Sequence, residues 1–213
     1  MAIKLHGSTL STCTQRVLQV LTELDVPYEF SDVNMALGEH KNPDFIANFQ
    51  PFGKVPALED DGLKLFESRA ICKYLITKYG KGHQLDSSQI ASIADIGIYE
   101  QAASVEYSYF EPAISGLGYE NIFKKFMGRG DADPAAVLQL RASLAQVLDY
   151  YEKVLATRQY LAGNEFSLVD LYHLPWMPFF AKLGLESELT SRPNFEAWWK
   201  RASSRPSWQK ISQ

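Results

Sequence analysis

The chain has 213 residues, of which 46% are hydrophobic and 22% are charged, and its formal net charge is -4. This length allows one large domain or two smaller ones, each with its own buried core. The slight acidic excess and the lack of a dense Lys/Arg cluster argue against a nucleic-acid partner. No apolar run approaches the roughly 20 residues that cross a bilayer, so we expect a soluble protein with no membrane partner.

Neither a targeting leader nor a cysteine framework is expected. The first residues, MAIKLHG, enter a strand pattern directly and lack the charged, apolar and small-residue regions of a signal peptide. The two cysteines, Cys13 and Cys72, are too few for a disulfide framework or a Cys-rich metal site. We therefore expect a cytoplasmic protein with reduced thiols.

The first 80 residues alternate between strand and helix periodicity. The expected elements are a strand at 3–6, a helix at 16–24, a strand at 28–33, a short helix in a polar loop at 38–50, strands at 55–58 and 63–66, and a helix at 68–78. This order predicts a small mixed sheet with helices packed on it.

Strand patterns stop after residue 80. A linker rich in Gly and polar residues at 81–88 precedes segments of helical periodicity, the clearest of which is 134–157, with a proline in its first turn. The predicted fold class is an α/β N-terminal domain at 1–80 followed by an all-α domain at 89–213.

A capping signal is prominent in the second domain. In NEFSLVDLYHL, Ser167 and Asp170 have the spacing of a capping box, and Phe166 and Leu171 have the spacing of a hydrophobic staple. Because one structural role explains all four residues, we interpret Asp170 as part of a helix start and not as a catalytic acid.

Two residue pairs between Gln50 and Leu75 are suited to binding a ligand. Pro56 at a strand start indicates a bend, with a cis peptide as one option, that turns the backbone of Val55 toward a ligand. Ser68 offers a hydroxyl and helix-terminal amides to a carboxylate, and Glu67 suits an ammonium group. Entry into an edge strand and simple capping of a helix explain the same residues, so neither pair decides the function alone.

Three further side chains are candidate donors to a second carboxylate. His40 and Lys41 lie on the predicted loop, and Lys54 precedes the Val-Pro step. His40 has no His or Cys at ligand spacing, so we expect no metal site.

The motifs LSTxxxRV, GEHKxPxF, PFGxVPALED, LFESRAI and LAGNxFSLVDL, in this order and spacing, resemble those of the cytosolic glutathione transferases, most closely the phi class. The resemblance covers essentially the whole chain. It implies a thioredoxin-like domain, an all-helical domain, and conjugation of glutathione to hydrophobic electrophiles in detoxification. It further implies a cytoplasmic homodimer that uses glutathione as co-substrate and needs no cofactor. A glutathione peroxidase side activity is left open.

The resemblance also implies a role for each site residue. The catalytic residue is Ser11, whose hydroxyl would donate a hydrogen bond to the glutathione sulfur; without a neighbouring His/Asp pair it is a donor and not a nucleophile. The implied glutathione-binding residues are His40, Lys41, Lys54, Val55, cis-Pro56, Glu67 and Ser68. The candidate walls of the hydrophobic substrate site are Leu10, Thr12, Met35, Tyr119, Phe123, Met177 and Phe179. Arg16 is expected to support the first helix.

Three alternatives stay open at this point. The sequence STCT at Ser11 to Thr14 also resembles the motif of zeta-class enzymes, which isomerise maleylacetoacetate with glutathione. Cys13 suggests a glutathione-dependent thiol transferase, although no CxxC is present. A non-catalytic carrier of hydrophobic ligands would need the same cleft.

Overall fold

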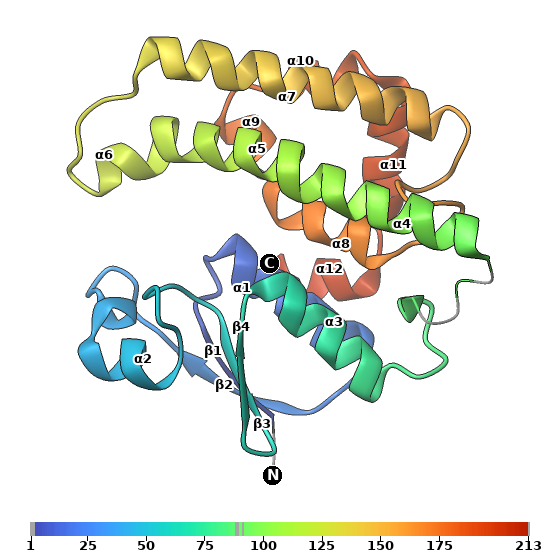
Figure 1. The fold of residues 1–213 in the computed structure, drawn as a ribbon. Coiled ribbons are helices and arrows are strands. Elements are labelled where there is room, and N and C mark those ends of the chain that lie inside the picture. Colours follow the sequence, from blue (N-terminus) through green and yellow to red (C-terminus); the bar gives the residue numbers. More distant parts are fainter. Residues whose placement is uncertain (1–2, 88–89, 91, 213) are drawn as a thin grey trace. The chain divides into compact units, whose positions relative to one another are not determined.

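The computed structural model describes residues 3–87, 90 and 92–212, which form two compact units (Figure 1). The first unit takes in the chain up to Gln89 together with Pro206–Gln213, and the second is Ile90–Arg205. The predicted boundary at residues 88 and 89 lies outside the described residues. Each unit is described by itself below.

The first unit contains a four-stranded mixed sheet in the order β2-β1-β3-β4. Its strands are β1 (Ile3–Gly7), β2 (Tyr28–Asp32), β3 (Ala57–Asp60) and β4 (Leu63–Phe66). β1 pairs with β2 in parallel and with β3 antiparallel, and β3 and β4 form a hairpin. A parallel pair needs a crossover connection, and the helix between β1 and β2 supplies it. The predicted mixed sheet is confirmed.

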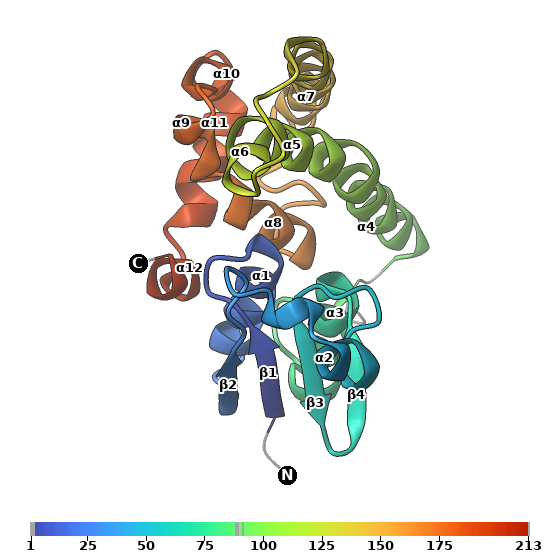
Figure 2. The same ribbon diagram turned by 90° about the vertical axis from the view of Figure 1, so that its left-hand side faces the viewer.

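Helices cover both faces of this sheet. Helices α1 (Thr12–Glu23) and α3 (Ser68–Tyr79) lie on one face, and α2 (Pro43–Asn48) lies on the other (Figures 1 and 2). The short 3-10 turn η1 (Glu39–Lys41) leads into α2. The apolar positions that the periodicity singled out form the core; among the completely buried side chains are Leu5, Val17, Val20, Ile71 and Leu75.

Two element boundaries differ from the sequence prediction near the candidate site. Helix α1 begins at Thr12, where Ser11 caps it, and not at residue 16. The prediction placed the start too late because the first turn of this helix is polar and carries no apolar periodicity. Strand β3 begins at Ala57, so Val55 and Pro56 lie outside the strand ladder.

The C-terminal helix was predicted to belong to the helical domain, and that prediction is wrong. Helix α12 (Pro206–Ile211) packs against α1 of the first unit. Its Trp208 is buried, and the hydroxyl of Ser207 hydrogen-bonds with Gln19 and Glu23. A helical period identifies the helix, but it does not say which unit its apolar face contacts.

A long helical rod and an antiparallel partner dominate the second unit (Figure 1). The rod consists of α4 (Ile93–Val105), α5 (Glu111–Gly118) and α6 (Lys124–Phe126), joined through the π-helical turns η3 (Glu106–Phe110) and η4 (Tyr119–Phe123). Its partner is α7 (Pro134–Leu155), which starts with the predicted proline in its first turn. The apolar face of α7 packs into the core through Leu144, Leu148 and Tyr151.

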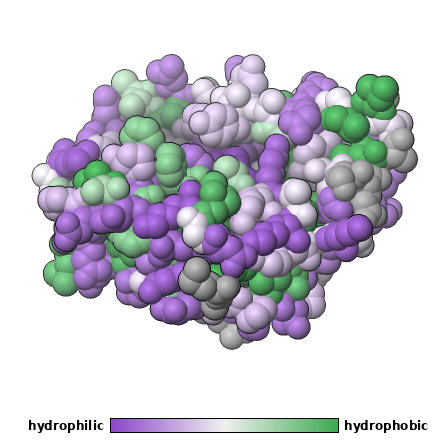
Figure 3. Space-filling model, turned by 60° about the horizontal axis from the view of Figure 1, so that its bottom comes forward, coloured by the Kyte–Doolittle hydropathy of each residue, from purple (hydrophilic) through white to green (hydrophobic). Residues whose placement is uncertain are grey.

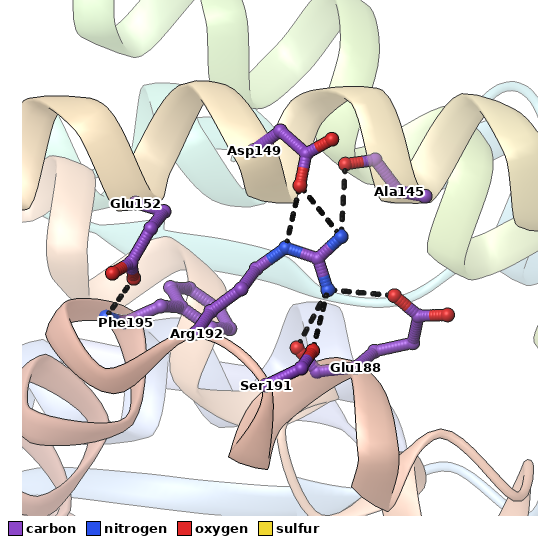
Figure 4. A network of polar contacts seen from close by, with 7 residues as sticks. All are labelled: Ala145, Asp149, Glu152, Glu188, Ser191, Arg192 and Phe195. Carbon is purple, nitrogen blue, oxygen red and sulfur yellow. Dashed lines mark hydrogen bonds and ion pairs between the residues drawn. The ribbon is translucent and has the colours of Figure 1, made fainter.

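The remaining helices of this unit are short. They are α8 (Leu168–His173), the 3-10 turn η5 (Leu174–Trp176), α9 (Phe179–Lys182), α10 (Glu186–Thr190) and α11 (Pro193–Ser203). Arg192, between α10 and α11, joins them to α7: its Nε donates to Asp149 Oδ1 at 2.9 Å, and its Nη1 donates to the Glu188 carbonyl at 2.8 Å (Figure 4). Glu152 of α7 accepts the backbone N–H of Phe195 at 2.9 Å and so caps α11.

The capping box at the start of α8 is confirmed, and it extends further than the sequence indicated. Ser167 Oγ accepts the N–H of Val169 at 3.2 Å, and Asp170 Oδ2 accepts the N–H of Ser167 at 2.9 Å. Asp170 Oδ1 also accepts from Leu161 N and from Trp198 Nε1. Burial raises the pKa of the Asp170 carboxyl, and these donors work in the opposite direction. The buried carboxylate thus connects three segments of the helical unit.

Within the described part of the chain, no helix is long and apolar enough to span a membrane. On the face of the molecule seen in Figure 3, hydrophobic residues are scattered among hydrophilic ones.

We predict that Asp170→Ala destabilises the protein by about 3 kcal/mol, because it leaves the buried donors of Leu161 and Trp198 unpaired. Asp133→Ala is the matched control, since Asp133 caps α7 at an exposed position, and it should cost about 1 kcal/mol. Denaturant unfolding of the two variants measures the difference. An equal loss of unfolding free energy in the two variants would mean that Asp170 acts only as a local cap.

Candidate active site

Ser11 lies where β1 passes into α1 and is the N-cap of that helix. Its backbone is extended (φ -84°, ψ 122°), and its half-buried hydroxyl accepts the N–H of Thr14 at 3.3 Å. The first turn of α1 contains no acidic residue, so the positive end of the helix dipole is not neutralised there. A thiolate beside Ser11 would meet both a hydroxyl donor and this positive potential.

Cys13 is half-buried in the first turn of α1, two residues beyond Ser11. The guanidinium of Arg16, itself completely buried, lies 3.6 Å from its sulfur through Nη1. Arg16 therefore supports the first turn, as expected. Burial raises the pKa of the Cys72 thiol to about 12, so Cys72 stays protonated and inert at neutral pH.

The three predicted basic donors are brought together by two segments that pack on each other. Lys41 Nζ donates to the carbonyl of Gly53 at 2.6 Å, which ties η1 to the turn at residues 50–54. The buried side chain of Gln50 accepts the N–H of Phe52 at 2.7 Å and of Lys54 at 3.2 Å. The sequence pattern did not predict this role of Gln50, whose only signal is its position before a proline.

Lys41 therefore has structural contacts that the sequence did not predict. Since it also donates to the carbonyl of Phe52 at 3.4 Å, one ammonium hydrogen is left for a ligand. Lys54 is exposed. Burial, followed by the charge of Lys41, lowers the pKa of the His40 imidazole, so this ring is neutral at pH 7. Its Nδ1 is buried and has no hydrogen-bond partner among the described residues. His40 is thus a neutral hydrogen-bonding group beside two ammonium groups.

Gly53 makes this packing possible. Its φ is +58°, and an added Cβ would lie 2.8 Å from the carbonyl oxygen of His40 and 3.0 Å from Lys41 Cδ. Only glycine combines this backbone conformation with such close approach.

Val55 presents backbone hydrogen-bonding groups to a ligand. The peptide between Val55 and Pro56 is cis, as the sequence prediction allowed. Val55 is 8% exposed, and among the described residues no other backbone group pairs with its N–H or C=O. Since buried backbone groups are nearly always paired, an extended ligand backbone would fit here as an added strand.

Glu67 and Ser68 lie at the start of α3, and the N-cap is Glu67 and not Ser68. Glu67 has φ +70° and ψ 107°, which is uncommon for a residue with a side chain. Such strain is often found at binding sites. The exposed Glu67 and the buried Ser68 stand beside amides of the first turn, which lack intrahelical partners.

The candidate walls of the hydrophobic substrate site are distributed over both units. In the first unit Leu10 is 86% exposed, Met35 is exposed and Thr12 is half-buried. In the second unit Tyr119, Phe123 and Phe179 are half-buried, and the rings of Phe123 and Phe179 lie 6.2 Å apart. Met177 is only 3% exposed and belongs to the core, so the structure does not support it as a wall residue.

No group of three or more His, Cys, Asp or Glu side chains with the geometry of a metal site occurs among the described residues. The polar groups assembled in the first unit are instead suited to an organic ligand with an ammonium group, an extended backbone and two carboxylates.

Comparison with known proteins identifies the family of this chain. Residues 1–77 match the model of the glutathione S-transferase N-terminal domain, and residues 107–206 match that of the C-terminal domain. The chain belongs to the glutathione S-transferase family, and its plant relatives are phi-class enzymes. The predicted family, fold class and transferase activity are confirmed.

Three relatives illustrate the similarity. Glutathione S-transferase PM239X14 of Arabidopsis thaliana is 43% identical over 93% of this chain and 90% of its own length. The crystal structure of glutathione transferase F7 from Populus trichocarpa superposes with a TM-score of 0.91 at 37% identity, covering 99% and 98% of the two chains. Maize glutathione S-transferase I in complex with an atrazine glutathione conjugate has a TM-score of 0.88 at 32% identity, covering 100% and 97%.

We predict that Gly53→Ala raises the dissociation constant of glutathione about tenfold, because the new methyl group separates η1 from the turn at 50–54. Gly62→Ala is the control: Gly62 also has positive φ (+84°), but an added Cβ meets nothing within 4 Å. Both variants should lose about 1 kcal/mol of stability through backbone strain. Calorimetric titration with glutathione measures the affinities, and equal affinities would contradict the predicted role of this contact.

Proposed function

We propose that this enzyme binds glutathione in its first unit, stabilises the thiolate through the hydroxyl of Ser11, and adds that thiolate to a hydrophobic electrophile. The observation that carries the proposal is the geometry of Ser11. Its oxygen accepts the N–H of Thr14 at 3.3 Å, so the hydroxyl proton is free to be donated away from the helix. Ser11 keeps that proton throughout the reaction.

The free energy that this site must supply to ionise the glutathione thiol is modest. A free thiol has a pKa near 8.5, and lowering it by two units takes about 2.7 kcal/mol of preferential thiolate stabilisation. One hydrogen bond to a charged sulfur and one helix terminus are of this order. The glutathione thiol loses its proton to solvent. The thiolate then attacks the electrophilic carbon, a C–S bond forms, and the leaving group departs with its electron pair.

The binding groups follow the chemistry of glutathione. We assign its γ-glutamyl ammonium and carboxylate to Glu67 and Ser68, and its cysteinyl backbone to the N–H and C=O of Val55 beside Pro56. The glycine carboxylate is assigned to the donors His40, Lys41 and Lys54. Support comes from the buried but unpaired backbone groups of Val55 and from the contact between Lys41 and Gly53.

We further propose that the electrophile is a neutral, hydrophobic molecule held by the exposed and half-buried apolar residues named above. The structure of the maize relative with an atrazine glutathione conjugate supports this substrate class by similarity. The walls assigned here are Leu10, Thr12, Met35, Tyr119, Phe123 and Phe179.

The cytoplasm is the compartment that we propose. Both cysteines are free in the structure. A reducing compartment preserves free thiols and also keeps glutathione in its thiol form.

Ser11→Ala should lower kcat/KM for the conjugation of glutathione to an activated aryl halide about tenfold at neutral pH, because the hydrogen bond to the charged sulfur is lost while the helix terminus remains. The dissociation constant of glutathione should change little, because the other binding groups remain. Steady-state kinetics and calorimetric titration measure the two quantities. Full activity in this variant would eliminate Ser11 as the thiolate donor.

Cys13→Ser is the matched control in the same turn, and it should retain conjugation. It also tests the thiol-transferase alternative: loss of a wild-type disulfide-reducing activity in Cys13→Ser would favour that alternative. Turnover of maleylacetone faster than conjugation would favour a zeta-like isomerase. A protein that binds hydrophobic ligands without any turnover would be a carrier.

We propose that the enzyme is a homodimer. A largely apolar groove of about 490 Å³ in the second unit is lined by residues that include Val105, Tyr109, Pro112, Leu140, Val147 and Tyr150, with the polar side chains of Gln101, Ser108, Ser143 and Gln146 among them. In the first unit, Phe52 is 65% exposed on the turn between Gln50 and Lys54. An aromatic ring of one copy inserted into the groove of the other, repeated by two-fold symmetry, would bury both apolar features.

Phe52→Ala should therefore weaken the dimer at least about tenfold, since burying an aromatic side chain contributes about 2 kcal/mol. Leu37→Ala is the control, because Leu37 is even more exposed and lies elsewhere on the first unit. Sedimentation equilibrium of both variants measures the dimer dissociation constant. An unchanged constant in Phe52→Ala would place the interface on a different surface.

A further inference from the structure

A closed ring of three hydrogen bonds surrounds the turn that carries Ser11. The backbone N–H of Ser8 donates to Thr14 Oγ1 at 3.4 Å. The backbone N–H of Ser11 donates to the carbonyl of Ser8 at 2.9 Å. The backbone N–H of Thr14 donates to Ser11 Oγ at 3.3 Å and closes the ring. Ser11 and Thr14 each contribute a side-chain acceptor and a backbone donor to the ring, and Thr14 is the residue whose side chain accepts the N–H of Ser8.

Burial prevents water from replacing Thr14 in this ring. Thr14 is completely inaccessible, and Ser8 is buried as well. The close approach of Gly7, the last residue of β1, leaves Thr14 no room to move: a Cβ on Gly7 would lie 2.5 Å from Thr14 Cγ2 and 2.8 Å from its Oγ1. Gly7 is held in turn by its carbonyl, which accepts the N–H of Val33 at 2.8 Å. Thr14 is therefore fixed against the sheet.

The turn itself has little packing of its own. Thr9 and Leu10, between Ser8 and Ser11, are both exposed. Gln15 Nε2 donates to the carbonyl of Thr9 at 2.8 Å on the exposed side, so the part-buried and buried hydrogen bonds that position the Ser11 hydroxyl lie at the two ends of the turn. Thr14 holds one end through Ser8 and the other through the Ser11 oxygen.

We infer that Thr14 is a positioning residue for the Ser11 hydroxyl. Its side chain holds Ser8, Ser8 holds the backbone of Ser11, and its N–H occupies one lone pair of Ser11 Oγ. The Ser11 O–H is thereby directed away from the helix, toward the sulfur. This inference rests on the proposed function of Ser11, and Thr14 itself touches no substrate.

The test variant is Thr14→Val, which keeps the shape of the side chain and removes the acceptor of the Ser8 N–H. The apparent pKa of bound glutathione, read from its thiolate absorbance and from the pH profile of kcat/KM, should rise by about one unit. The kcat/KM for an activated aryl halide at neutral pH should fall about threefold, in proportion to the thiolate fraction, while the dissociation constant of glutathione stays within about twofold. Thr14→Ser keeps the hydroxyl and should restore the wild-type pH profile.

Thr22→Val is the matched control on the same helix. The hydroxyl of Thr22 donates to the carbonyl of Leu18 at 2.8 Å, away from the turn, so its removal should leave the pH profile unchanged. In a Ser11→Ala background, Thr14→Val should cause no further rise in the thiol pKa, because the group that it positions is gone.

The outcomes separate this inference from the proposed function. Loss of activity in Ser11→Ala combined with a wild-type pH profile in Thr14→Val would overturn the inference alone. Full activity in Ser11→Ala would overturn the catalytic assignment and, with it, the inference. An equal effect of Thr14→Val with and without Ser11 would show that Thr14 acts through another group.

A measurement on the wild-type protein keeps the test valid should Thr14→Val fail to fold. The amide hydrogens of Ser8 and Ser11 should exchange with solvent much more slowly than that of the exposed Leu10. Fast exchange at Ser8 and Ser11 would mean that the ring does not hold the turn, and the inference would fall.

Discussion

The hydrogen bond from the Thr14 N–H to the Ser11 hydroxyl is the interaction on which the site depends. It begins α1, and α1 is the crossover that allows β1 and β2 to pair in parallel. The same bond places a hydroxyl at the positive end of a helix with no acid in its first turn. One local contact therefore serves the fold of the first unit and, in the proposed mechanism, the stabilisation of a thiolate.

The rest of the proposed glutathione site consists of segments that lie outside the regular elements. The turn at 50–54 is held by Gln50 from within and by Lys41 from η1, and it ends at Val55, which is free of the strand ladder. Glu67 has a backbone conformation at the start of α3 that is uncommon for a residue with a side chain. The sheet thus presents backbone groups and charges that are available to the proposed ligand.

The helical unit is held together by buried polar groups in addition to its apolar core. Asp170 connects the start of α8 to Leu161 and Trp198, and Arg192 connects α7 with α10. These contacts stabilise the unit that presents Tyr119, Phe123 and Phe179. Their role is structural, which agrees with the interpretation of Asp170 as a helix start and not as a catalytic acid.

By itself the sequence determined the features that depend on neighbouring residues: the βαβαββα order, the capping box of Ser167 and Asp170, and the motifs that resemble the phi class. It also predicted the cis peptide at Pro56 as an option. Capping and strand periodicity act over a few residues, so their signals are local and readable.

Only the tertiary structure decided what depends on contacts between distant segments. It placed α12 on α1, Lys41 on the Gly53 carbonyl and Met177 in the core, and it revealed the strain at Glu67. For α12, Lys41 and Met177, the sequence offered several chemically suitable partners. The packing of the folded chain selected one of them, because burial and hydrogen-bond geometry are satisfied together only there.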